Sequence, residues 1–431
     1  MTRRRRAALP LALVLAAGAA GCGDDDGGGG ADTEAGEVVV VEADLARATP
    51  SPSAPVDQVV AGLDAFTLEA ERIMAADTGG NTVLSPLSIG VAFAMVSAGA
   101  DDTTAAQIAD VFGFPEQTAL HESMNSLTAA LAEANQTGDE RGDVVLETVN
   151  DLWAQSGFDV EPDFLDTLAT QYGAGMPTTD FEADPEAGRA AINHSVAEAT
   201  RDRIPDLMPE GSVTEDTRAV VVNSVYFTAP WASEFSEDAT APGPFHLDDG
   251  STAEVQMMRD SGLQTRALVG DGYTAVELPY VGDELAMLVV VPDASTTVDD
   301  VLAGLGEGGL GAVADGLGGA TVDLTLPRWE TGEATDLAPL LTDLGLPIPG
   351  GSLGGVAPNL EIGAAVHAAD ITVDEAGTEA AAATAVGMEV TSAPLEDEIV
   401  TVVADRPFVF AVRHLETGAP LFVGRVADPR G

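Results

Sequence analysis

Residues 370–390 read DITVDEAGTEAAAATAVGMEV and carry more information about this protein than any other stretch. Along residues 378–390 every second position is small or apolar and uncharged, while the intervening positions hold both glutamates. This alternation is typical of a strand with one buried face. However, the alanines at 380–383 have little preference for a sheet, and Gly377 before them permits a hinge. The pattern predicts a conditional strand; an alanine-rich helix or loop is the alternative.

The chain on either side of this stretch changes from helical to strand patterns along its length. Apolar spacing predicts a first helix over residues 56–74, and the Ser85-Pro86 pair predicts the start of a second that ends near Gly99. Further helices are expected at residues 104–112, 118–133, 162–172, 185–200 and 298–305. Strands are expected at residues 144–153, 219–228, 275–278, 285–291, 320–326, 364–373, 399–403, 408–414 and 420–426. Because no regular alternation, repeat or linker follows residue 56, we expect one α+β domain over 56–431.

Several further motifs lie on either side of residues 370–390. They comprise NTVLSPLSI at 81–89, VNSVYF at 222–227 with Trp231 downstream, ELPY at 277–280, LPRW at 326–329, VH at 366–367, DRPF at 405–408 and GRV at 424–426. Together with the hinge sequence they resemble the serpins, and the resemblance covers roughly residues 60–430. It implies a serpin fold, a single large domain with a central, mostly antiparallel sheet, helices clustered around it and an exposed reactive loop.

The resemblance implies an irreversible, suicide-substrate inhibitor rather than an enzyme. In serpins a serine protease attacks the exposed loop, and the cut loop then enters the main sheet as a new strand, in the manner of strand addition. The energy stored in the uncut fold is released, and the tethered protease is distorted before its acyl-enzyme is hydrolysed. We therefore expect a covalent complex with a target protease, no catalytic residue and no cofactor.

The same resemblance assigns roles to particular residues. The hinge and inserting loop comprise Glu375, Gly377, Thr378, Ala380, Ala382 and Thr384. The alternation supports this assignment independently, because the inward positions are the small, uncharged ones. A hydrogen-bonding cluster under the opening sheet comprises Ser88, Asn223 and His367. The alternative for His367, a satisfied core histidine, is almost the same claim, and the functional addition is that His367 controls sheet opening. Trp231 matches a position near the entry point of the loop.

The family's usual spacing from Glu375 places the cleaved bond between Thr391 and Ser392. A β-branched, uncharged side chain at Thr391 favours elastase- or subtilisin-like proteases. The segment from 392 to 406 is longer than is common in the family, so Val390 or Met388 remains open as the residue that the protease reads.

Other chemistry has little support in the sequence. GEGGLG at 306–311 has the spacing of a dinucleotide-binding loop but follows a predicted helix among acidic residues. GGSLG at 350–354 has the spacing of a nucleophile elbow, without the required strand before and helix after it. The histidines form no i, i+4 pair, so no metal site is expected. A non-inhibitory serpin-fold surface binding protein or mere protease substrate, and a secreted hydrolase that uses Ser352, remain the alternatives.

The chain is strongly acidic. It carries 71 acidic residues against 18 basic ones, all of them arginine, for a net charge of −53. Such a charge repels phosphate backbones and anionic lipid, which excludes nucleic-acid binding and electrostatic membrane docking. Residues 118–133 contain no lysine or arginine, so no heparin-like cofactor is expected. Adaptation to high salt and a high-GC genome both account for the missing lysine.

The N-terminus has the pattern of a secretion signal. Four arginines at 3–6 precede an apolar run at 7–20 that is too short to span a membrane. Residues 19–22 resemble a bacterial lipobox ending at Cys22, which predicts lipid attachment there; an ordinary signal peptide is the alternative. We expect a signal peptide at 1–21, a flexible acidic, Gly- and Pro-rich tether at 22–55, and a monomeric extracellular body, secreted or anchored to the outer face of the cell membrane only through the lipid.

Overall fold

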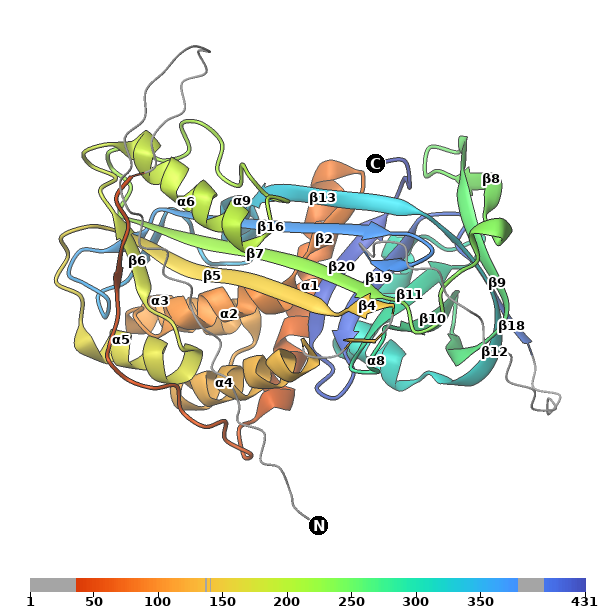
Figure 1. The fold of residues 1–431 in the computed structure, drawn as a ribbon, viewed down its shortest axis with the longest axis horizontal. Coiled ribbons are helices and arrows are strands. Elements are labelled where there is room, and N and C mark those ends of the chain that lie inside the picture. Colours follow the sequence, from red (N-terminus) through yellow and green to blue (C-terminus); the bar gives the residue numbers. More distant parts are fainter. Residues whose placement is uncertain (1–35, 136–137, 140, 379–398) are drawn as a thin grey trace. The chain divides into compact units, whose positions relative to one another are not determined.

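The computed structural model describes residues 36–431 apart from 136–137, 140 and 379–398 (Figure 1). Several predicted site residues therefore lie outside the described residues: Cys22, Ala380, Ala382, Thr384, Thr391 and Ser392, together with the alternatives Met388 and Val390. None of the helices in the described part combines the length and apolar character that crossing a membrane requires.

A seven-stranded main sheet forms the centre of the protein (Figure 1). Its strands in spatial order are β1 (Val39–Val41), β6 (Met176–Thr179), β5 (Val145–Gln155), β7 (Ala219–Pro230), β17 (Gly377–Thr378), β16 (Ala364–Val373) and β13 (Trp329–Asp336). Most neighbours are antiparallel, but β5 is parallel to β6 and β7 is parallel to β16. The expected α+β architecture with a central, mostly antiparallel sheet is confirmed.

A second sheet carries most of the C-terminal strands. Its order is β18 (Ile399–Val403), β12 (Gly318–Pro327), β9 (Thr252–Val269), β10 (Tyr273–Pro279), β11 (Leu285–Pro292), β19 (Phe408–His414), β20 (Pro420–Val426) and β2 (Thr82–Leu84), with β8 (Ala241–His246) paired to β9. Two small pairs stand apart from it, β3 (Gly138–Asp139) with β4 (Gly142–Asp143) and β14 (Gly350–Ser352) with β15 (Glu361–Ile362). The sequence pattern did not predict β9, because residues 259–262 read RDSG, which is typical of a turn.

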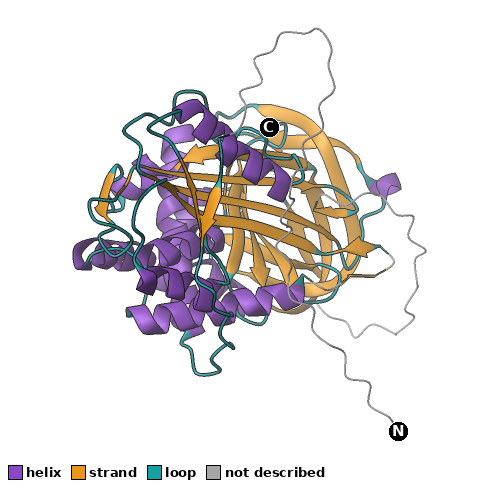
Figure 2. Ribbon diagram, turned by 60° about the vertical axis from the view of Figure 1, so that its left-hand side comes forward, coloured by secondary structure: helices purple, strands orange, loops and turns teal. Residues whose placement is uncertain are grey.

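The helices gather mainly on one side of the strands (Figure 2). They are α1 (Val56–Thr78), α2 (Pro86–Ser97), α3 (Asp102–Phe112), α4 (Gln117–Ala134), α5 (Pro162–Thr167) with a π-helical turn at Leu168–Tyr172, α6 (Pro185–Ala199), α7 (Val298–Gly304), α8 (Gly309–Asp315) and α9 (Leu337–Asp343). All residues of α2 are buried, and Ser85 caps it by accepting from the Ser88 backbone N–H at 3.3 Å. Helix α2 packs on one face of β5 and β7, and α6 packs through Ile192 and Val196 on the other.

The first described residues belong to the folded body. Val39–Val41 pairs antiparallel with β6 at an edge of the main sheet, and Arg47 donates to Asn125 Oδ1 on α4 at 2.7 Å. The sequence assigned all of 22–55 to the tether, because the Val38–Val41 run is too short to indicate its partner. The structure instead joins parts of residues 36–55 to the body, through Val39–Val41 on β6 and through Arg47, Ala48 and Ser51 on the helices.

Candidate functional site

Strands β7 and β16 of the main sheet pair directly with each other at one end and are separated by β17 at the other. Strands β7 and β16 pair directly only over residues 220–225 and 364–369, a stretch that we call the seam. Beyond the seam, the two-residue strand β17 lies between them, with Thr378 opposite both Ala229 of β7 and Val373 of β16. The start of the predicted conditional strand is therefore already part of the sheet in the intact chain.

Thr378 is the deepest residue of this inserted end. Its side chain is fully buried, and its Oγ1 lies 2.7 Å from the Tyr280 hydroxyl. Thr228 Oγ1 donates to the Thr378 carbonyl at 3.1 Å. Burial raises the pKa of Tyr280, so its phenol stays protonated and can take part in this hydrogen bond. Thr378 thus faces the interior, as the alternation predicts.

Gly377 is needed here for a reason that differs from the expected one. The sequence suggested a glycine with free backbone dihedrals, but a Cβ at this position would lie 2.2 Å from the Ala229 carbonyl oxygen and 2.7 Å from the Cα of Pro230. Real Cβ atoms essentially never approach other atoms so closely. The close approach of two backbones, rather than an unusual φ, requires glycine at 377.

Glu375 anchors the chain before β17. Its side chain is only 7% exposed and accepts from Arg328 Nε at 2.9 Å and from the Thr240 hydroxyl, and its Oε1 forms an ion pair with Arg328 Nη2 at 2.7 Å. Burial opposes ionisation of Glu375, but the hydrogen bonds from Arg328 and Thr240 hold its pKa below the ordinary value. Sequence reasoning assigned no role to Arg328, although it belongs to the quoted LPRW motif.

Trp231 holds the same segment from the end of β7. Its backbone N–H donates to the Ala376 carbonyl at 2.9 Å, and its indole Nε1 donates to the Asp374 carbonyl at 3.0 Å. Its ring stacks on Tyr280 with the centroids 4.6 Å apart. We call residues 374–378 with Trp231, Tyr280 and Arg328 the hinge site. The sequence placed Trp231 near this point but did not indicate that the indole itself binds the hinge.

The seam is held by a buried polar cluster. Asn223 of β7 lies opposite His367 of β16, and the His367 Nδ1 is hydrogen-bonded to the Asn223 side-chain oxygen. Asn223 Nδ2 donates to Ser88 Oγ at 2.6 Å, and the Asn150 amide lies 2.9 Å from the same Oγ. The Ser85 backbone N–H donates to His367 Nε2 at 3.1 Å. The three residues assigned to this cluster from sequence lie together, and Asn150 of β5 joins them.

His367 is neutral in this environment. Its side chain is 1% exposed, and burial lowers its pKa to about 3. Because Nε2 accepts from the Ser85 N–H, the proton resides on Nδ1 and is donated to Asn223. The cluster therefore joins α2, β7 and β16 without a charge, at the place where a strand entering the sheet would have to separate β7 from β16.

Ser352 does not have the surroundings of a catalytic nucleophile. It ends the short strand β14, and the residues after it lead to β15 instead of to a helix. Its carbonyl accepts from the Asp101 backbone N–H at 3.0 Å. In the described part of the chain the strand–turn–helix of a nucleophile elbow is therefore not formed at Ser352. GEGGLG likewise begins in a 3-10 turn and continues into α8, with no strand before it.

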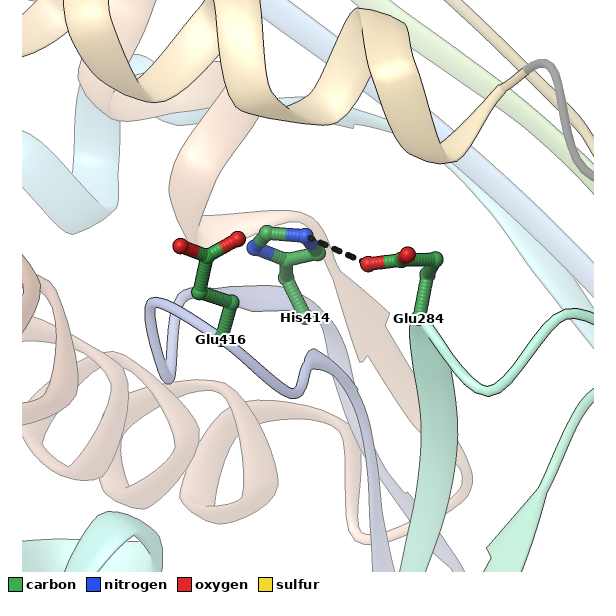
Figure 3. A group of neighbouring side chains, drawn as sticks. All are labelled: Glu284, His414 and Glu416. Atoms are coloured by element: carbon green, nitrogen blue, oxygen red, sulfur yellow. Dashed lines mark ion pairs between the residues drawn. The ribbon is translucent and has the colours of Figure 1, made fainter.

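One group of side chains has the composition of a metal site. Glu284, His414 and Glu416 have ligand atoms within 4.8 Å of one another, and Figure 3 shows the two carboxylates on opposite sides of the imidazole. His414 Nδ1 is hydrogen-bonded to Thr417 Oγ1 at 2.8 Å, which leaves Nε2 facing Glu284 at 3.9 Å. Because Thr417 and Glu284 face the two ring nitrogens, His414 joins the start of β11 to the turn after β19.

The sequence matches known proteins over nearly the whole described body. A family model described as serpin (serine protease inhibitor) matches residues 61–429. The chain is 34% identical to antithrombin-III of Mus musculus over 364 residues, which are 81% of this chain and 76% of that protein. It is 33% identical to the leukocyte elastase inhibitor of Homo sapiens over 383 residues, which are 85% of this chain and 97% of that protein.

Solved structures show the same arrangement of strands and helices. Arabidopsis AtSerpin1 in its native stressed conformation aligns with a TM-score of 0.75 at 26% identity and covers 87% of this chain and 99% of its own. The thermophilic tengpin in its native state aligns with a TM-score of 0.76 at 20% identity, covering 90% of this chain and 97% of its own. The second similarity supports the fold alone.

Proposed function

Because the chain belongs to the serpin family, we propose that it is a single-use inhibitor of extracellular serine proteases, consumed when its exposed loop is cut and enters the main sheet. Its own side chains catalyse no reaction in this process. The observation that carries the proposal is β17, two residues of the hinge already paired between β7 and β16 in the intact chain. The proposed insertion extends this strand in the same gap.

The gap is suited to such an extension. Beyond the seam, residues 226–228 of β7 and 370–372 of β16 face each other without direct pairing. A strand that continued from Thr378 would pair with both edges and bury alternate side chains. The inward positions in the sequence would be Ala380, Ala382 and Thr384, which are small enough to pack against the layer beneath the sheet and leave no charge in the interior.

The target protease is inferred from the loop sequence. We propose cleavage between Thr391 and Ser392, with Val390 or Met388 as the alternative residue read by the protease. Uncharged residues here favour elastase- or subtilisin-like pockets, and the similarity to a protein named leukocyte elastase inhibitor supports that class. We expect no polysaccharide cofactor, because helix α4 (Gln117–Ala134) contains no lysine or arginine.

The site of action is inferred from the N-terminal sequence. We propose that the protein is a bacterial lipoprotein, anchored through Cys22 to the outer face of the cell membrane, or is secreted if the signal is an ordinary one. In either case it acts as a monomer that touches the membrane only through its lipid. The net charge of −53 supports this, since it disfavours contact of the body with anionic lipid.

A gel assay tests the proposal. The protein is incubated with subtilisin or elastase, and the products are separated under denaturing conditions and analysed by mass spectrometry. We expect a covalent, SDS-stable complex and a new C-terminus at Thr391, Val390 or Met388. Cleavage without a complex would contradict inhibition and favour a non-inhibitory serpin-fold protein. Ester hydrolysis abolished by Ser352→Ala would favour a hydrolase instead.

A further inference from the structure

A short hairpin between α4 and β5 reaches the hinge site from outside the main sheet. Strands β3 (Gly138–Asp139) and β4 (Gly142–Asp143) pair antiparallel and lead directly into β5. A Cβ on Gly142 would lie 3.7 Å from Cγ of Pro230, the last residue of β7. The hairpin therefore lies against the turn at residues 230–232, where β7 ends and Trp231 binds the hinge.

Arg141 makes the polar contacts of this hairpin. Its guanidinium is gripped by Asp139, with Nε at 3.0 Å and Nη2 at 2.5 Å from Asp139 Oδ2. The Arg141 backbone N–H also donates to Asp139 Oδ1 at 2.8 Å. These bonds fix the direction of the guanidinium, and its remaining nitrogen, Nη1, donates to the carbonyls of Trp231, at 3.3 Å, and of Ala232.

Trp231 and Ala232, whose carbonyls Arg141 binds, also donate hydrogen bonds on the side of the hinge. Trp231 donates its N–H to Ala376, and Ala232 donates its N–H to the Pro279 carbonyl at 2.9 Å. Pro279 precedes Tyr280, whose hydroxyl bonds Thr378. A cation on the carbonyl of the 231–232 peptide strengthens the donation by its N–H through hydrogen-bond cooperativity. Arg141 therefore acts directly on the route through Ala232, Pro279 and Tyr280. It also fixes the position of Trp231, whose own N–H belongs to the preceding peptide unit and binds Ala376.

We propose that Arg141 is a positioning residue for loop insertion, a role that rests on the proposed inhibitory function. By fixing the turn at residues 230–232, it keeps β17 docked and aligned with the gap. Because β17 is already paired between β7 and β16, the loop can extend an existing strand. It therefore avoids the entropy cost of ordering the first residues in the gap. Insertion must be completed before the acyl-enzyme is hydrolysed. If the hinge is aligned for a smaller fraction of the time, insertion is slower relative to hydrolysis of the acyl-enzyme. More molecules are then cleaved as substrate without trapping the protease.

The first test measures docking in the intact protein and does not require inhibition. In Arg141→Ala, hydrogen exchange followed by mass spectrometry should be at least tenfold faster in peptides covering Trp231 and residues 376–378. Arg430→Ala is the matched control, because Arg430 pairs with Asp428 two residues before it, Nη2 to Oδ2 at 2.6 Å, far along the chain from the hinge. Unchanged exchange in Arg141→Ala would overturn the proposal, and equal acceleration in both variants would reduce it to a general loss of stability.

The second test separates positioning from target recognition. With a protease that the wild type traps, Arg141→Ala should need at least twice as many inhibitor molecules per protease trapped, while the rate of initial loop cleavage stays unchanged. An unchanged requirement, or a change confined to the cleavage rate, would overturn the role in insertion. If the wild type traps no protease, the proposed function fails. The rate at which a nicked loop gains heat resistance then decides the role of Arg141: slower conversion in Arg141→Ala supports it, and equal rates overturn it.

Discussion

The hinge site and the seam lie between the same two strands and are held differently. At the hinge site β7 and β16 are separated by β17, which is held by backbone hydrogen bonds, by a glycine without space for a Cβ and by side chains that include the charged Glu375–Arg328 pair. At the seam the strands pair directly, over a neutral side-chain network centred on Asn223 and His367. An entering strand would extend the first region and break the second. In the proposed mechanism, insertion begins at the hinge site and is resisted at the seam.

The largest expected effect is that of Thr378→Arg at the hinge site. An arginine there would place a charge in the sheet interior, at a cost of several kcal/mol, so β17 should leave the sheet and the cut loop should not enter it. We expect cleavage by the target protease without a covalent complex, observed on denaturing gels. Thr252→Arg, at an exposed strand position of β9, should behave as the wild type. A normal yield of complex in Thr378→Arg would contradict the mechanism.

A smaller effect is expected from Gly377→Ala. The added methyl would overlap the Ala229 carbonyl, and relieving this overlap should cost about 1–3 kcal/mol of unfolding free energy, measured by denaturant titration. The control is Gly304→Ala at the end of α7, where no atom lies within 4 Å of the new Cβ. That change should be neutral or slightly stabilising. Equal losses in the two variants would mean that the hinge site does not need glycine at 377.

The last effect, no larger than that of Gly377→Ala, concerns the seam and its pH dependence. Burial lowers the pKa of His367 to about 3, so below pH 6.5 the unfolded chain takes up a proton that the folded chain does not. Stability should therefore be lost as pH falls, by about 1.4 kcal/mol per pH unit for this group. Asp64 and Asp151, whose pKa values burial raises to about 6, act in the opposite direction. The measurement must therefore compare the wild type with His367→Gln.

The stability advantage of the wild type over His367→Gln should shrink from pH 6.5 to 4.5, as measured by denaturant titration at each pH. His121→Gln provides a second variant of the same kind, because burial lowers the pKa of His121 to about 4 on α4, outside the seam. The stability advantage of the wild type over His121→Gln should also shrink as the pH falls. Parallel stability curves for the wild type and His367→Gln would show that His367 does not titrate as its burial implies.

Much of the fold could be predicted because its signals are local. The Ser85 cap marks the start of α2, and alternation along 378–390 predicts the inward face of Thr378. The long strand β9 was missed because RDSG in its middle imitates a turn, and a partner strand overrides that local preference. The edge strand at Val39–Val41 was missed because three valines do not indicate a partner more than 130 residues away.

The residues of the candidate site likewise comprise some that the sequence indicated and others that only the structure revealed. Glu375, Gly377 and Thr378 stand out in one contiguous motif, so sequence reasoning found them. Arg328 and Tyr280 lie in motifs that were quoted without a role, and Arg141 gave no signal at all. Their importance arises from the atoms that they meet, the Glu375 carboxylate, the Thr378 hydroxyl and the Trp231 carbonyl.

The sequence alone determined that this protein is a strongly acidic chain with one α+β body, and it predicted that the small-residue segment at 378–390 is a conditional strand. Those properties follow from periodicity, composition and the sizes of side chains, which need no partner to be read. Only the tertiary structure decided that β17 is already docked, that Gly377 is required by a neighbouring backbone and that a hairpin arginine supports the hinge from outside. Each of these depends on contacts between residues that are far apart in the sequence, and a local sequence pattern does not indicate such contacts.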